Sequence, residues 1–208
     1  LVYGPTTIQF STADFIQKQG GYLARHYEEV ENVYHSGADV VIRVAREYSV
    51  SPRLLLALLE YQSGWVTQSD PAEATLEYPI GYINPYYDSL YMQLAWAANN
   101  LNRGYYLWKA NGITGWILAD GQLVPPAPTL NPGTAGVQHF FSLLYGQSDW
   151  ERAVCQQADH DPLLAKIKAG EPLTDAEETE LAQRLNQPQH YFNEDNLRRA
   201  YRNPGGNL

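Results

Sequence analysis

Cysteine is almost absent from this sequence, with only Cys155 among 208 residues. A single thiol excludes an intramolecular disulfide and leaves the redox compartment open. The five histidines show none of the paired spacings that zinc sites use, so we expect no metal and no cofactor. No apolar run approaches the length of a membrane span, and no signal-peptide pattern is present. The chain begins at Leu1 rather than Met, as expected if a leader or an upstream segment has been removed.

Positive charge is also scarce. Lysine and arginine together number 14 against 23 aspartates and glutamates, which gives a net charge of -9. Nucleic acid and anionic membrane surfaces both require a basic face, so we expect neither as a partner and no insertion into a membrane. Hydrophobic residues make up 44% of the chain, which is enough apolar material for a folded core.

The spacing of the apolar residues predicts a mainly α fold. Ser51-Pro52 is an N-cap followed by proline at the first helical position, and residues 54–59 are apolar on every side. This pattern predicts a buried central helix that ends at Gly64. Asp120-Gly121, between two short apolar runs, predicts a short β-hairpin. Residues 66–89 form a long loop, which in a compact domain is more often functional than idle. Further helices are expected over residues 11–33 with an interruption at Gly20-Gly21, after Ser36, over residues 90–109 and over residues 131–144.

The composition changes after Trp150. The last part of the chain has no tryptophan, is dense in charge and carries three compact helix signals. These are Asp161-Pro162, the capping box of Thr174 with Glu177, and Asn193. We therefore expect two parts, a domain over residues 1–153 and a small helical appendage over residues 160–208, with the boundary near residues 153–159.

The end of the expected central helix reads Glu60-Tyr61-Gln62-Ser63-Gly64-Trp65. It resembles the segment in which lysozyme-like glycosidases and lytic transglycosylases carry their catalytic glutamate. Residues 90–94 and 130–134 resemble two further transglycosylase segments, of which the second lines the glycan groove. Residues 1–153 resemble more closely still the lysozyme-like N-terminal domains found ahead of zinc endopeptidase domains in bacterial cell-wall hydrolases. Aligned on Ser63-Gly64, the family's glutamate falls on Gln62, as is usual for that group.

This resemblance implies a peptidoglycan-directed groove and a set of side chains that line it. The substrate-binding residues that it implies are Gln62, Ser63, Tyr82, Tyr91, Gln93 and Asn131. Tyrosine rings suit such a surface because they stack on the apolar faces of sugars. Two of the assignments have plain structural alternatives, since Gln93 also fits a polar helix face and Asn131 fits a helix cap.

Glutamine at position 62 changes the expected chemistry. An amide donates and accepts hydrogen bonds but has no proton to give at neutral pH, so Gln62 is expected to bind a sugar without cleaving it. Glu60 is the alternative catalytic acid, although two residues along a helix correspond to about 200° of rotation and hence to another face. The loop acids Asp70, Glu73 and Glu77 are further alternatives, and their plain interpretation is as solvated charges.

The tail has a different likeness. Residues 160–208 resemble the helical C-terminal region of restriction-type helicase subunits, which lies outside the motor and carries no catalytic motif. No phosphate-binding loop of the glycine–lysine type occurs in the sequence, so the chain is not expected to be a helicase.

These features together favour an extracytoplasmic, lysozyme-like helical domain that binds peptidoglycan or a related glycan without being an enzyme. An active muramidase or lytic transglycosylase that uses Glu60 or a loop acid is one alternative. A helical module for protein interaction is the other. The sequence leaves the sugar unit and the oligomeric state open.

Overall fold

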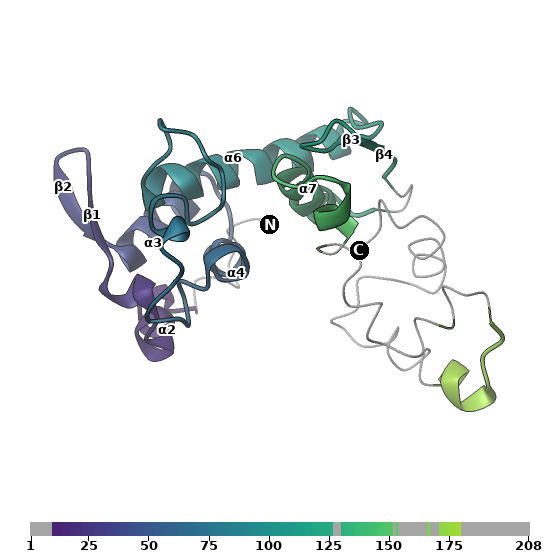
Figure 1. The fold of residues 1–208 in the computed structure, drawn as a ribbon, viewed down its shortest axis with the longest axis horizontal. Coiled ribbons are helices and arrows are strands. Elements are labelled where there is room, and N and C mark those ends of the chain that lie inside the picture. The colour runs from purple at the N-terminus through teal and green to yellow at the C-terminus, as the bar shows by residue number, and fades with distance from the viewer. Residues whose placement is uncertain (1–9, 127–129, 152, 154–165, 167–170, 180–208) are drawn as a thin grey trace. The chain divides into compact units, whose positions relative to one another are not determined.

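The computed structural model describes residues 10–126, 130–151, 153, 166 and 171–179 (Figure 1). The chain divides into two compact units, Leu1–Arg103 and Gly104–Leu208. The described residues are mainly helical, as predicted, with two short antiparallel hairpins. None of the helices in the described part is long and apolar enough to cross a membrane.

The first unit is mainly helical, and one face of the predicted central helix contributes to its core. Its elements are α2 (Thr12–Gln19), η1 (Tyr22–Arg25), β1 (Tyr27–Val30), β2 (Val33–Ser36), α3 (Gly37–Glu47), α4 (Pro52–Ser63), α5 (Ala74–Glu77) and the first turns of α6 (Leu90–Lys109). Helix α4 is the predicted central helix: it begins after Ser51 and ends at Gly64, whose φ of 69° is left-handed. Leu55 and Leu59 are fully buried in the core, whereas Ala57 and Tyr61 on the opposite side are exposed, so the helix is not buried on every side as its sequence suggested.

The prediction of helix from residue 11 to residue 33 is wrong beyond Arg25. Strands β1 and β2 pair there as an antiparallel hairpin in which Tyr27 lies opposite Ser36 and Val30 opposite Val33. The two turn residues, Glu31 and Asn32, both have positive φ, 54° and 65°. Such a two-residue turn matches the right-handed twist of paired strands. The hairpin was missed because its turn contains no glycine.

The backbone before the hairpin pairs with the segment that follows α4. The N–H groups of Gly21, Tyr22 and Leu23 donate to the carbonyls of Val66, Gln68 and Trp65. Gly21 is required there because a Cβ on it would clash with the carbonyl of Val66. The end of α4 is therefore fixed by backbone hydrogen bonds as well as by its packing.

The second unit contains the end of α6, strands β3 (Trp116–Ile117) and β4 (Leu123–Val124), and α7 (Pro132–Ser142). The predicted hairpin at Asp120-Gly121 is confirmed, with Gly121 at a φ of 83°. The buried indole of Trp116 donates to Gln138 of α7 at 3.0 Å.

Little of the tail lies within the described residues. The capping box predicted there is present, since the hydroxyl of Thr174 accepts from the N–H of Glu177 at 3.4 Å and the carboxylate of Glu177 accepts from the N–H of Thr174 at 2.8 Å. Residues 175–179 are helical. The predicted helix starts at Asp161-Pro162 and Asn193, and most of the predicted boundary, lie outside the described residues.

Candidate functional site

Glu60 and Gln62 leave the last turn of α4 in different directions. The carboxylate of Glu60 accepts three hydrogen bonds, from the N–H groups of Val66 and Thr67 at 3.1 Å each and from the hydroxyl of Thr67 at 2.6 Å. Glu60 thus fixes the turn that follows the helix. Both carboxylate oxygens are therefore engaged with the chain's own turn in this conformation.

Gln62 is half-buried and lies beside the loop that carries Gly81. A Cβ built on Gly81 would be 3.8 Å from Nε2 of Gln62, so the loop backbone comes close to the amide. Gly81 has a φ of 85° and closes a turn in which its N–H donates to the carbonyl of Tyr78. The structure thus brings Gln62 next to the loop in which the sequence resemblance placed tyrosines of the groove.

The side chain of Gln93 hydrogen-bonds to the backbone of this loop. Its side chain is completely buried on α6. Its amide oxygen accepts from the N–H of Ile80 at 3.2 Å, and its NH₂ group donates to the carbonyls of Tyr82 and Tyr87 at 2.7 and 2.6 Å. Both N–H donors are therefore engaged with the loop backbone. In this conformation the amide of Gln93 is engaged with the loop backbone and positions Tyr82.

The loop presents aromatic and apolar side chains to solvent. Tyr82 stacks on Trp96 of α6, with ring centroids 4.1 Å apart and planes 7° from parallel. Tyr87 meets the Tyr82 ring edge-on at 5.2 Å. Beyond this cluster, Tyr86 is 84% exposed and Ile83 is 80% exposed. A ring supported from below, beside exposed neighbours, suits stacking against a sugar.

Tyr91 belongs to a charged cluster that joins α6 to α3. Its hydroxyl donates to Glu47 at 2.8 Å, and the guanidinium of Arg43 lies 5.2 Å from the centre of its ring. Burial first, and then the hydrogen bond to Glu47, raise the pKa of Tyr91 to about 12. Partial burial opposes ionisation of Glu47, but hydrogen bonds from Arg43 and Tyr91 outweigh it and lower the pKa of Glu47. Arg43 also pairs with Glu31 of the hairpin turn at 2.5 Å.

Ser63 and Asn131 have local structural roles. Ser63 is buried, and its hydroxyl donates to the carbonyl of Leu59 at 2.8 Å. Asn131 caps α7 by accepting from the N–H of Thr134 at 2.9 Å, and it belongs to the second unit. The loop acids Asp70, Glu73 and Glu77 are exposed.

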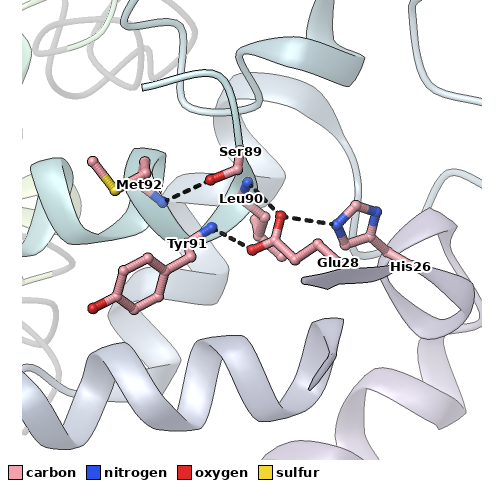
Figure 2. Close-up of polar contacts among 6 residues, drawn as sticks. All are labelled: His26, Glu28, Ser89, Leu90, Tyr91 and Met92. Carbon is pink, nitrogen blue, oxygen red and sulfur yellow. Dashed lines mark hydrogen bonds and ion pairs between the residues drawn. The ribbon is translucent and has the colours of Figure 1, made fainter. Parts of the chain in front are cut away.

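The sequence analysis missed Glu28, a carboxylate that is only 11% exposed (Figure 2). It accepts from the N–H groups of Leu90 and Tyr91, at 2.9 and 2.7 Å, and lies 3.4 Å from Nε2 of His26. Glu28 therefore caps the helix that carries Gln93. Its signal in the sequence was hidden because residues 27–30 were assigned to a helix rather than to a strand.

Among the described residues, no group of three histidine, cysteine, aspartate or glutamate side chains is arranged to hold a metal ion. The polar groups around α4 and the loop are instead engaged with backbone. The region combines the amide of Gln62 with the aromatic side chains of the neighbouring loop, and these are groups that form hydrogen bonds and stack on rings.

Comparison with known families decides where the chain belongs. The family model described as LasA, N-terminal domain matches residues 1–169. The chain is a member of that family. The LasA N-terminal match covers all of the first unit, with α4 and the loop. LasA itself is a staphylolytic peptidase that is associated with cell-wall hydrolysis.

A second family model, described as EcoEI R protein C-terminal, matches residues 147–208, so the tail is similar to that region. The two matches overlap over residues 147–169. No curated protein and no solved structure matches the chain.

Proposed function

We propose that the first unit binds the glycan strands of peptidoglycan without cleaving them, through the surface formed by the end of α4 and the loop of residues 78–89. The observation that carries the proposal is the pair Gln62 and Glu60. The side chain beside the loop is an amide, and the nearest carboxylate on the helix is held by the backbone of residues 66–67.

Three further points support it. The LasA family connects the chain to cell-wall hydrolases. The sequence around Gln62 resembles the segment in which lysozyme-like domains carry their catalytic glutamate. Tyr82 is held in place by stacking on Trp96, and the ring of Tyr86 is exposed and accessible for stacking on a sugar. A glutamine amide has the donor and acceptor types that pair with sugar hydroxyl and acetamido groups.

Sedimentation of the full chain with purified peptidoglycan sacculi tests binding. Tyr86→Ala should weaken it about fivefold, because one stacked ring contributes about 1 kcal/mol. Tyr106→Ala is the matched control, since Tyr106 is 62% exposed but lies in the second unit. Equal effects of the two substitutions, or no sedimentation of the native chain, would refute glycan binding at the loop and favour a module for protein interaction.

Release of soluble muropeptides tests cleavage, and the native chain should release none. Gln62→Glu restores a transferable proton at the end of α4. The negative end of the helix raises the pKa of the introduced carboxyl, so weak activity is expected, strongest below neutral pH. Glu60→Gln provides the control: muropeptide release by the native chain that disappears in Glu60→Gln would show that Glu60 is the acid and that the protein is an active muramidase or transglycosylase.

A further inference from the structure

An apolar pocket of about 460 Å³ lies between α2 and α4, on the side of α4 that faces away from Gln62. Its walls include Phe10 and Phe15, whose ring centroids are 5.3 Å apart, together with Leu56 and Val66. The volume falls within the range of sites that take small organic molecules. Nothing in the proposed glycan surface uses this pocket.

One end of the pocket is positively charged. Arg53, in the first turn of α4, lines it with its guanidinium 4.6 Å from the centre of the Phe10 ring. That turn contains no acidic side chain, and Ser51 makes no side-chain cap to it. The partial positive charge of the helix N-terminus therefore adds to that of Arg53. Within the described part of the chain, Arg53 has no carboxylate partner.

The other end contains Glu60, seven residues and about 10 Å further along the helix axis. Its carboxylate oxygens are held by Val66 and Thr67, as described above. An anion at this end would be repelled by Glu60, whereas an anion at the Arg53 end would be attracted. An anionic amphiphile in the pocket is therefore expected to place its charged group at Arg53 and its apolar chain towards Glu60.

We propose that this pocket binds a single-chain aliphatic carboxylate, with the carboxylate at Arg53 and the hydrocarbon chain between Phe10, Phe15 and Leu56. The apolar walls remove the chain from water, which is the main source of affinity for such a ligand. The net charge of -9 opposes binding to an anionic bilayer, so the ligand is a monomeric carboxylate rather than a membrane. This proposal is independent of glycan binding.

Titration calorimetry of the full chain with hexanoate, octanoate and decanoate tests the chain-length dependence. Affinity should rise about fourfold for each added methylene until the pocket is filled. Decanol should bind about fivefold more weakly than decanoate, because it lacks the ion pair with an exposed arginine. Affinity that does not change with chain length, or equal affinity for decanol and decanoate, would overturn the proposal.

Two substitutions locate the site. Ala57 is exposed and lines the pocket, so Ala57→Phe should fill the volume and abolish decanoate binding without removing any core packing. Arg53→Gln should reduce decanoate affinity about fivefold and leave decanol affinity unchanged. Ala74→Phe and Arg46→Gln are the matched controls, since both positions are exposed and do not line the pocket.

Circular dichroism and the thermal midpoint check that each variant is folded. If Ala57→Phe is unfolded, Ala57→Met replaces it as the filling variant. Decanoate binding that survives a folded filling variant refutes the pocket as the site. Binding to vesicles of phosphatidylcholine and phosphatidylglycerol that is unaffected by the filling variant would refute a monomeric ligand in favour of a membrane surface.

Discussion

Glu28→Ala should destabilise the first unit more than any other single removal of a carboxylate from the β1–β2 hairpin. Glu28 lies on β1, 62 positions before Leu90 in the sequence, yet its two oxygens accept from the first N–H groups of α6 (Figure 2). These groups have no partner within the helix, since the first turn of any helix leaves its N–H groups unpaired. The carboxylate therefore caps α6, and its hydrogen bonds connect the hairpin to that helix.

The magnitude follows from the geometry. A hydrogen bond to an ionised group is worth about 1.5–3 kcal/mol, and a negative charge at a helix N-terminus adds about 0.5 kcal/mol. The side chain is 11% exposed, so water replaces only part of what is lost. Glu28→Ala should therefore lower the free energy of unfolding by about 3 kcal/mol. Glu28→Gln, which keeps one acceptor oxygen but loses the charge, should cost about half as much.

Urea unfolding gives the free energies, and hydrogen exchange of the Leu90 and Tyr91 amides reports the cap directly. Both amides should exchange faster in Glu28→Ala. Glu29→Ala is the control, because Glu29 is the next residue on β1, points to the opposite face of the hairpin and is exposed. A cost below about 0.5 kcal/mol for Glu28→Ala, equal to that of Glu29→Ala, would show that water can take over the cap and that the reasoning is wrong.

Two further predictions concern the charged cluster and the second unit. The pKa of Tyr91 is about 12 in the folded chain, against an ordinary value of 10.0. The protonated hydroxyl therefore stabilises the fold below about pH 10, and this contribution is lost as the pH rises through about 12. The difference in unfolding free energy between Tyr91→Phe and the native chain, measured by urea unfolding, should vanish over that interval. In Gly104→Ala, the new Cβ would be 2.5 Å from Cβ of His139 and 2.9 Å from Cα of Gly136. This overpacking costs about 2 kcal/mol and outweighs the gain in helix propensity of about 1 kcal/mol, so the thermal midpoint should fall; a rise would show that α6 and α7 separate easily.

Much of the fold follows from local signals in the sequence. The Ser51-Pro52 start, the Asn131 cap and the Asp120-Gly121 turn were each predicted, and each lies where expected. These signals depend only on neighbouring residues, which is why sequence alone reveals them. The β1–β2 hairpin instead has a turn without glycine, and its Glu28 contacts the start of α6, which is distant in the sequence. Neither feature leaves a local pattern that separates it from a helix.

The candidate site was harder to predict than the fold. The sequence predicts that Gln93 is polar and on a helix, but whether such an amide meets a ligand or the chain's own backbone depends on the path of residues 78–89. The structure places three backbone groups of that loop around it, from Ile80, Tyr82 and Tyr87. A buried amide must find such partners, because leaving it unpaired costs more than the bonds gain.

Glu60 and Gln62 show what helical geometry does and does not determine. The rotation of about 200° between them predicts different faces, and the structure places Glu60 against residues 66–67 and Gln62 against Gly81. The rotation does not predict which contacts the side chain on each face of α4 makes. Hydrogen bonds hold the carboxylate of Glu60 against the turn after α4, and the same side chain also lines the apolar pocket. The amide of Gln62 is the group beside the aromatic loop, and the sugar binding that we propose there needs no acid.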